Sequence, residues 1–318
     1  MTPKIFFEVV EIRTKVASVF PFLIGTLFSM TFFHEVHWLN TVIFFLGMLI
    51  FDLATTAINN YMDYHKAHSS VYKYEENVIG RSGVSSKLIR NMIFFMIFLT
   101  FVIGVYLTIQ TGWLLFFMGA LCCFIGIFYT FGPIPLSRMP LGEIFSGITM
   151  GLGIFSMVVY VNTFSSEFVY LSLSFAKETF TLTGSIWAVF AVGIASIPLI
   201  CTIANIMLAN NLRDLERDIE NKRYTLVYYI GRPVGIKLFE GLMYTCYVAL
   251  AIGLVLGIYS WPIIIAFGSL PKIYKNVQEF KQTLPEPRSF GYAIKNMVLF
   301  NSSYAAGLFL TLLWQMVK

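Results

Sequence analysis

Charge is scarce in this sequence, and the scarcity excludes most soluble folds. Asp, Glu, Lys and Arg make up 12% of the 318 residues, whereas about a quarter is usual in soluble domains. Hydrophobic residues make up 57%, and the mean hydropathy is +0.74. We therefore expect an integral membrane protein of the all-α class, with a single domain over residues 1–318.

Cysteine is also scarce, and its spacing fits neither a disulfide framework nor a metal site. The four cysteines all lie in apolar runs, at Cys122, Cys123, Cys201 and Cys246. We interpret them as small buried hydrophobic residues. The N-terminus lacks the small-residue cleavage site of a signal peptide. We therefore expect the first apolar run to stay in the protein as a membrane span.

Long apolar runs, by contrast, are abundant. A helix needs roughly 17–25 residues to cross the hydrocarbon core of a bilayer. Nine runs reach or approach that length and predict nine transmembrane helices, at residues 16–33, 39–58, 91–110, 112–130, 142–162, 185–208, 237–257, 259–271 and 294–316. The eighth run is the shortest of the nine.

Lys and Arg are distributed unevenly among the segments that join these runs. If the N-terminus is cytoplasmic and the spans alternate, the cytoplasmic segments are 1–15, 59–90, 131–141, 209–237 and 272–295. These segments hold 20 of the 22 Lys and Arg residues, as the positive-inside rule requires. The pattern predicts a multi-pass protein of the cell membrane with three long cytoplasmic loops. We interpret the outer segment 163–184 as interfacial.

Two clusters of Asn and Asp close apolar runs on the predicted cytoplasmic side. Asn59 and Asp63 are four residues apart in the first cluster. Asp214 and Asp218 are four apart in the second, and Asn210 lies one turn earlier. Residues four apart on a helix share a face, and their oxygens suit Mg2+, which few protein ligands hold together with substrate phosphates. The sequence therefore predicts a Mg2+ site built from both clusters.

One further acid, Asp52, lies inside the second apolar run. It is on the same helical face as Asn59 and Asp63. An ionisable residue within a span is a functional candidate by default. The alternative is a structural role, in which Asp52 bonds to a polar side chain of a neighbouring helix. The sequence leaves both interpretations open.

Acidic clusters at one end of an apolar bundle suit a substrate with a diphosphate head and a long apolar tail. Metal ions and basic side chains neutralise the phosphates. The C–O bond then ionises, and the allylic cation meets an electron-rich acceptor. A polytopic transporter is the alternative from a different class. Transporters place ionisable residues near the midplane of the membrane, whereas most acids here cluster at helix ends, which favours an enzyme.

The two clusters resemble the two signatures of the UbiA-type intramembrane prenyltransferases. Residues 59–63, NNYMD, resemble the first signature. Residues 210–218, NNLRDLERD, followed by 221–226, NKRYTL, resemble the second in the form typical of the 1,4-dihydroxy-2-naphthoate polyprenyltransferase branch. The link 129–143, YTFGPIPLSRMPLGE, also resembles that branch. The resemblance covers nearly the whole chain.

This resemblance implies a UbiA-like helical bundle, a Mg2+ cofactor and a prenyl transfer. The group would pass from a polyprenyl diphosphate to the naphthoate ring, with loss of the ring carboxylate, to give demethylmenaquinol for menaquinone biosynthesis. The implied partners are these two substrates and the lipid bilayer, with no nucleic acid. Metal binding and catalysis fall to Asn59, Asp63, Asn210, Asp214 and Asp218. Phosphate contacts fall to Lys66, Arg213, Lys222 and Asn210, and acceptor contacts to Tyr129, Arg138 and Glu143.

The sequence departs from the family pattern in three places. No second acid follows Asp63 within the next turns, so the sequence does not decide whether the site holds two metal ions symmetrically. Residue 60 is Asn where the family often has Asp. Arg138 stands where this branch is expected to have Tyr, and it either pairs with the carboxylate of the acceptor or is an ordinary cytoplasmic charge. Because motif form does not fix the acceptor, 4-hydroxybenzoate or a heme ring is an alternative.

Overall fold

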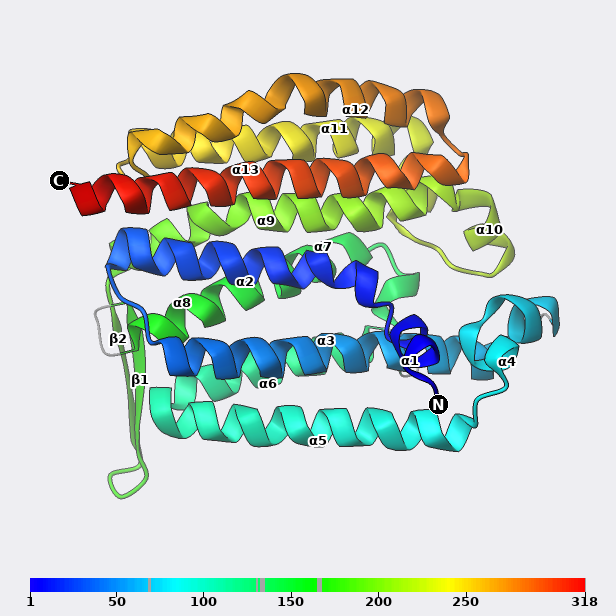
Figure 1. Ribbon diagram of the computed structural model, residues 1–318, viewed down its shortest axis with the longest axis horizontal. Coiled ribbons are helices and arrows are strands. Elements are labelled where there is room, and N and C mark those ends of the chain that lie inside the picture. The colour runs from blue at the N-terminus through cyan, green and yellow to red at the C-terminus, as the bar shows by residue number, and fades with distance from the viewer. Residues whose placement is uncertain (68–69, 130, 132–134, 165–167, 318) are drawn as a thin grey trace.

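The computed structural model describes residues 1–67, 70–129, 131, 135–164 and 168–317. Helices run side by side along the longest axis of the molecule, as Figure 1 shows. The long segments are α2 (Val16–Phe28) with η2 (Ser29–Phe33), α3 (Trp38–Lys66), α5 (Ser86–Thr111), α6 (Trp113–Phe128), α7 (Gly142–Ser146) with η5 (Gly147–Ile154) and α8 (Phe155–Thr163), α9 (Ile186–Arg213), α11 (Leu226–Val255), η6 (Trp261–Ser269) with α12 (Leu270–Thr283), and α13 (Phe290–Val317). The connecting helices are α1 (Pro3–Val9), η1 (Ile12–Lys15), η3 (Tyr72–Glu76), α4 (Val78–Ser82), η4 (Leu136–Arg138), α10 (Leu215–Glu220) and η7 (Pro287–Ser289).

The helices confirm the predicted all-α membrane bundle. Seven described helical segments are long and apolar enough to cross a bilayer. Helix α6 is apolar but only 16 residues long. The segment made of η6 and α12 becomes polar over its second half. The protein is therefore a multi-pass membrane protein, and the count of nine spans stays a prediction.

The three long polar segments predicted as loops are helical over much of their length. Helix α3 continues to Lys66, α9 continues to Arg213, and α11 begins at Leu226. Hydropathy marks the part of a helix that lies in lipid, whereas backbone hydrogen bonding continues into the polar region beyond it. Both Asn/Asp clusters therefore begin on the ends of membrane helices. In the link 129–143, Thr130, Gly132 and Pro133 lie outside the described residues.

Two glycines set the close approach of η5 to α9. A Cβ on Gly147 would lie 2.9 Å from the carbonyl oxygen of Ile200, and one on Gly151 would lie 2.6 Å from the Ile200 nitrogen. Small residues four apart allow membrane helices to pack backbone against backbone. This contact brings α7, which begins at Gly142, alongside the C-terminal half of α9.

The buried apolar residues form two separate clusters. The larger one lies among α2, α8, α9, α11 and α13. The smaller one joins α1, α4 and α5 to the last turns of α3, through Val9, Val10, Ala54, Ala57, Ile58, Val78, Ile79, Ile89, Ile93 and Met96. The two Asn/Asp clusters are therefore anchored in different cores.

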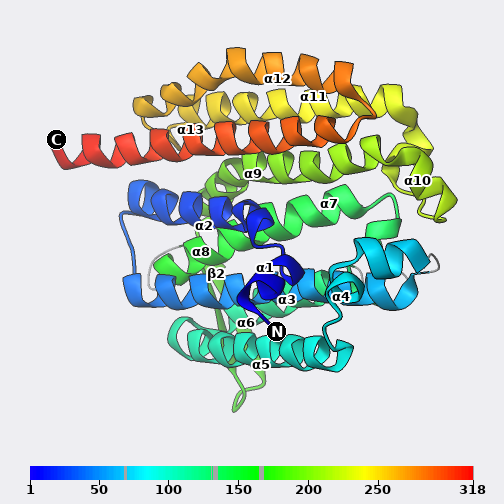
Figure 2. The ribbon, with the colours of Figure 1, turned by 45° about the vertical axis from the view of Figure 1, so that its right-hand side comes forward.

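A hairpin of two antiparallel strands crosses the end of the bundle at which α3 and α9 begin (Figure 1). Strand β1 (Val169–Ser174) pairs with β2 (Thr179–Gly184). Figures 1 and 2 both show the strands running across the helix ends, with the tip reaching past α5.

Candidate active site

The two Asn/Asp clusters lie at the same end of the bundle. Figures 1 and 2 place the last turns of α3 beside α4 at that end, where α9 passes into α10. Arg223 acts electrostatically on both Asp63 and Asp218. One guanidinium is thus within electrostatic range of an acid of the first cluster and an acid of the second.

Arg213 donates hydrogen bonds to the side-chain oxygens of Asn210 and Asp214 at the end of α9. Its Nε donates to Asp214 Oδ1 at 2.8 Å, and its Nη2 donates to Asp214 Oδ2 at 2.5 Å and to Asn210 Oδ1 at 2.7 Å. The guanidinium carbon also lies 5.1 Å from the ring centroid of Phe290. A planar guanidinium is well shaped for such two-point contact with a carboxylate. Arg213 therefore holds Asp214 and Asn210 in a fixed geometry.

The backbone breaks at Asp214 without losing the one-turn spacing. Helix α9 ends there and α10 begins, with Asp214 at φ −97° and ψ 14°. The amide of Asp214 still donates to the Asn210 carbonyl at 3.0 Å, and the amide of Asp218 donates to the Asp214 carbonyl at 2.8 Å. The helix is therefore interrupted at Asp214, but Asn210, Asp214 and Asp218 remain one turn apart.

Asp218 is the buried acid of the site. The residue is 3% exposed. Its Oδ1 lies 3.5 Å from Arg223 Nε, and its Oδ2 is buried without a hydrogen-bond partner. Burial raises the pKa of this carboxyl above its usual range, while the charge of Arg223 opposes the rise. A buried carboxylate oxygen with no partner is costly, so this atom is suited to accept a cation.

Hydrogen bonds at Arg223 and its neighbour join the turn before α7 to the loop after α10. Its Nη2 donates to the Ser137 carbonyl at 3.4 Å, and its amide donates to the Asp218 carbonyl at 2.8 Å. The amide of Tyr224 donates to the Arg138 carbonyl at 3.1 Å. Arg138 itself is exposed and acts electrostatically on Asp63. The turn before α7 and the loop after α10 therefore form one wall.

A second buried acid, Glu143, lies at the start of α7. It is 4% exposed, and Asn211 Nδ2 donates to its Oε1 at 2.8 Å. Glu143 Oε2 and Asn211 Oδ1 are both buried without a partner. The Tyr129 hydroxyl donates to the Gly142 carbonyl at 3.3 Å. Tyr129 and Glu143, both predicted to contact the acceptor, thus lie together.

Comparison with known proteins identifies the family. The sequence profile of the UbiA prenyltransferase family matches residues 18–283. The chain belongs to this family. It is 27% identical over 303 residues to the 1,4-dihydroxy-2-naphthoate octaprenyltransferase of Bacillus subtilis (strain 168), covering 95% of this chain and 89% of that one. The resemblance to that branch is therefore confirmed, and the protein is a prenyltransferase.

Solved structures support the same fold. A UbiA homolog from Aeropyrum pernix K1 in its apo form superposes with a TM-score of 0.67 at 13% identity, covering 92% of this chain and 96% of that one. A UbiA homolog from Archaeoglobus fulgidus bound to GPP and Mg2+ superposes with a TM-score of 0.62 at 11% identity, covering 96% and 99%. At these identities the likeness establishes the UbiA fold.

Three further residues predicted for this UbiA site are Asn59, Lys66 and Lys222. Asn59 is partly buried, and none of the hydrogen bonds among the described residues involves its side chain. Lys66 is exposed but acts on Asp63. Lys222 is exposed and has a left-handed backbone, with φ 54°. Its neighbour Arg223 turns inward instead. Sequence reasoning missed Arg223, although the basic pair at 222–223 was a signal that one of the two would enter the site.

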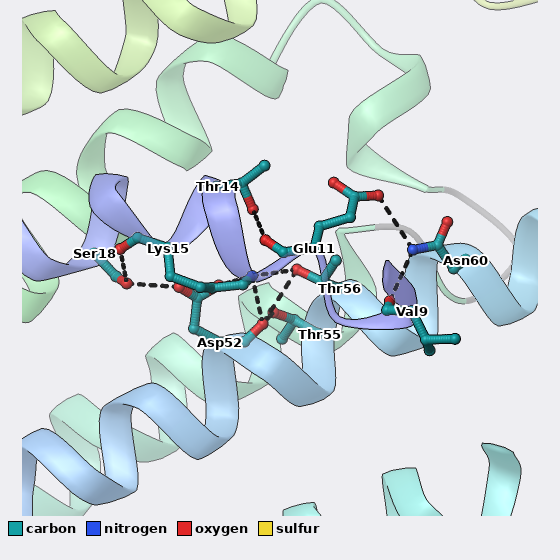
Figure 3. Close-up of polar contacts among 9 residues, drawn as sticks. All are labelled: Val9, Glu11, Thr14, Lys15, Ser18, Asp52, Thr55, Thr56 and Asn60. Atoms are coloured by element: carbon teal, nitrogen blue, oxygen red, sulfur yellow. Dashed lines mark hydrogen bonds and ion pairs between the residues drawn. The ribbon is translucent and has the colours of Figure 1, made fainter. Parts of the chain in front are cut away.

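Asp52 has a structural partner. Lys15 Nζ lies 2.8 Å from Asp52 Oδ1 and also donates to Thr56 Oγ1, while Ser18 Oγ donates to Asp52 Oδ2 at 2.6 Å (Figure 3). Lys15 is 4% exposed. These contacts tie η1 and α2 to α3. The structural interpretation of Asp52 therefore accounts for its place in the span.

Asn60 also serves the N-terminal segment. Its Nδ2 donates to the Val9 carbonyl at 2.9 Å and to Glu11 Oε1 at 3.1 Å, as Figure 3 shows. The side chain of Asn77 in turn donates to the Asn60 carbonyl at 3.1 Å. An amide at residue 60 can donate these bonds, whereas the Asp that the family often has there cannot.

The oxygens of this UbiA site suit a metal that arrives with its substrate. Among the described residues, no group of three or more His, Cys, Asp and Glu side chains is arranged to hold a metal ion. Mg2+ commonly takes only one or two carboxylates, and substrate phosphates supply the remaining ligands. Asp218 Oδ2 has no partner, and Asp214 and Asn210 are bonded to Arg213. These hard oxygens fit Mg2+ bound together with a diphosphate.

Proposed function

We propose that this UbiA-family enzyme transfers a polyprenyl group from a polyprenyl diphosphate to 1,4-dihydroxy-2-naphthoate. The prenyl C–O bond breaks, a C–C bond to the ring forms, and the ring carboxylate leaves as CO2, giving demethylmenaquinol. The observation that carries the proposal is that Arg223 acts electrostatically on both Asp63 and Asp218 at one end of an apolar bundle. The naphthoate acceptor is supported by the form of the second signature and by the Bacillus subtilis relative.

The diphosphate head would lie between the two Asn/Asp clusters. The metal-binding residues would be Asn59, Asp63, Asn210, Asp214 and Asp218. When bound, Mg2+ would neutralise phosphate oxygens and make diphosphate a better leaving group. Arg213 and Arg223 place fixed guanidinium groups at this head, where they stabilise the charge that develops on the departing oxygen. Lys66, at the exposed end of α3, adds a further positive charge.

The acceptor would lie against the wall formed by the turn before α7. Asn211 fixes the Glu143 carboxylate, and Tyr129 closes the same corner through the Gly142 carbonyl. Arg138 lies at the exposed rim and acts on Asp63, so it is near the boundary between the two substrates. A carboxylate on the acceptor could pair with it there. The apolar tail of the donor would lie among the membrane helices.

The distribution of basic residues supports a cytoplasmic active site in the cell membrane. The end of the bundle that holds both clusters also carries most of the chain's Lys and Arg, which the positive-inside rule places in the cytoplasm. Both substrates have anionic heads, and they would enter from that side. Their heads would then meet the basic residues before their apolar parts reach the bundle.

An assay of the purified enzyme in detergent tests this function. We expect diphosphate release that requires Mg2+, a polyprenyl diphosphate and 1,4-dihydroxy-2-naphthoate together, with a prenylated product that has lost the mass of CO2. Parallel reactions with 4-hydroxybenzoate test the acceptor. Release with 4-hydroxybenzoate alone would assign a different acceptor, and no release with any aromatic acid would remove the proposal.

A further inference from the structure

The hairpin of β1 and β2 has one apolar face and one hydroxyl face. Residues directly opposite each other in an antiparallel pair share a face. The register pairs Leu171 with Leu182 and Leu173 with Phe180 on one face. On the other face every side chain carries a hydroxyl: Tyr170, Ser172, Ser174, Thr179, Thr181 and Thr183. Such strict alternation is typical of a sheet that lies between an apolar and a polar medium.

The base of the hairpin is fixed to the bundle, but its outer half is not covered. Phe168, just before β1, is 4% exposed, and the ring of Tyr170 lies over Gly112, where a Cβ would come within 3.3 Å. In the outer half, Phe180 is 75% exposed and Leu182 is 60% exposed. Phe175, in the turn, is 73% exposed. The apolar face is therefore left open where the hairpin projects past α5 (Figures 1 and 2).

This open face continues the exposed apolar surface of α6. The ring of Phe175 packs edge-on against Trp113, with the centroids 5.9 Å apart. Trp113 begins α6 and is followed along the helix by Phe116 and Phe117, which are also exposed. Exposed aromatic residues on a membrane helix face lipid, and Trp is enriched at the membrane–water interface. The tip of the hairpin thus lies beside a helix end that carries the aromatic residues typical of a membrane–water interface.

We propose that the outer half of the hairpin rests on the lipid bilayer at the end of the bundle opposite the active site. Phe175, Phe180 and Leu182 enter the boundary between headgroups and acyl chains, while the row of Ser and Thr hydroxyls faces water and headgroups. The segment acts as a peripheral anchor built from β-structure, in the way that amphipathic helices lie in an interface.

The charges of the hairpin agree with a lipid partner. From residue 168 to 185 the only charged side chains are Lys177 and Glu178, which are adjacent at the turn. The apolar face therefore carries no charge that a lipid surface would exclude or that a protein partner would need to pair. The hairpin also runs across the helix ends (Figure 1), so its long direction is roughly parallel to a bilayer that the helices cross.

Spin labels on the two faces test the proposal in the full-length enzyme in lipid nanodiscs. Phe180→Cys and Leu182→Cys place labels on the apolar face, and Thr181→Cys and Thr183→Cys are matched controls one residue away. Cys122 and Cys123 are first changed to Ala, and retained prenyl transfer verifies that background. Cys201 and Cys246 are buried. Each label is measured with oxygen, which concentrates in lipid, and with a water-soluble nickel complex.

We expect the ratio of oxygen to nickel accessibility to be several-fold higher at 180 and 182 than at 181 and 183. Equal access of the nickel complex to all four positions would place the hairpin in water and overturn the proposal. Line broadening at 180 and 182 that grows with the number of protein copies per disc would assign the face to a second copy instead. Loss of the alternation in detergent and its return in nanodiscs would add support.

Discussion

The two Asn/Asp clusters form the two halves of the site, and the polar residues around them differ in what they bond to. The first half is the end of α3 with Asp63, and the second half is the end of α9 with α10. In the second half, Asp218 is 3% exposed and retains an oxygen without a partner, and Arg213 holds Asp214 and Asn210. In the first half, Asp52 and Asn60 are engaged in holding the N-terminal segment to α3. Asp63 in that half interacts electrostatically with Arg223 of the other half.

This difference predicts an asymmetric enzyme. The first half contributes one carboxylate, Asp63, near the end of α3. The nearby Asp52 and Asn60 hold the N-terminal segment to that helix. The second half contributes two carboxylates and an amide that are already oriented by arginine. We infer that most of the electrostatic stabilisation of the leaving diphosphate comes from the second half.

Asp218→Asn removes a buried charge at nearly constant shape. We expect kcat to fall by about 10²–10³-fold, the usual cost of removing one preorganised electrostatic group, with the fold retained. Turnover with saturating substrates, together with a melting curve, measures this. Glu216→Gln is the matched control on α10, because Glu216 is exposed and pairs with Arg232 at 2.8 Å. Full activity in Asp218→Asn would mean that the buried acid is structural.

Asp63→Asn tests the other half of the comparison. We expect a smaller loss, about 10–100-fold in kcat/KM, in line with the loss of a single charge-assisted interaction. The Mg2+ concentration for half-maximal rate should rise as well, because one metal-binding carboxylate is gone. Equal losses in Asp63→Asn and Asp218→Asn would show that the two halves contribute symmetrically.

Arg223→Ala and Lys222→Ala decide which basic residue serves the diphosphate. We expect Arg223→Ala to raise KM for the polyprenyl diphosphate at least about tenfold, because a hydrogen bond to a charged group contributes roughly 1.5–3 kcal/mol. Lys222→Ala should have a smaller effect, since its side chain is exposed. The acceptor's KM serves as the internal reference. A larger effect at Lys222 would return that residue to the role first predicted for it.

The Lys15–Asp52 pair should affect stability far more than turnover. Lys15→Met leaves a partly buried carboxylate unpaired, and breaking a buried pair typically costs about 3–5 kcal/mol. The double change Lys15→Met with Asp52→Asn removes both charges, so we expect it to recover much of the loss. Melting temperatures of the wild type, the two single variants and the double variant form a double-mutant cycle. A large fall in kcat for the double variant at an unchanged melting temperature would instead make Asp52 functional.

Much of this organisation could be predicted from sequence because it depends on local properties. Apolar runs and the Lys/Arg bias predicted a membrane bundle, and four-residue spacing predicted the two Asn/Asp clusters. The sequence could not show which of Lys222 and Arg223 turns inward, because that depends on a left-handed turn at Lys222 and on a hydrogen bond from Tyr224 to Arg138 far away in the sequence. The pairing of Asp52 with Lys15 joins residues 37 positions apart, and no short-range pattern encodes it.

The smallest expected effect concerns stability and pH, and it sharpens the assignment of Asp218. Burial raises the pKa of this carboxyl from its ordinary value of 3.8, against the opposing charge of Arg223. A carboxyl with a higher pKa in the folded state binds more protons when folded, so stability falls as pH rises from the unfolded pKa through the folded one. Below both pKa values the carboxyl is protonated in the folded and the unfolded state. Its contribution to the free energy of unfolding is then fully present.

In metal-free buffer, Asp218→Asn should therefore melt close to the wild type at the acid end of the range and above it at neutral pH. Adding Mg2+ with a non-reactive diphosphate analogue should reverse that order, because ligand binding stabilises the folded state only where the site is intact. Thermal unfolding of both proteins across pH, with and without the ligands, measures the two differences. If Asp218→Asn melted below the wild type at neutral pH without metal, the pair with Arg223 would outweigh the cost of burial. The acid would then be a structural partner of that arginine.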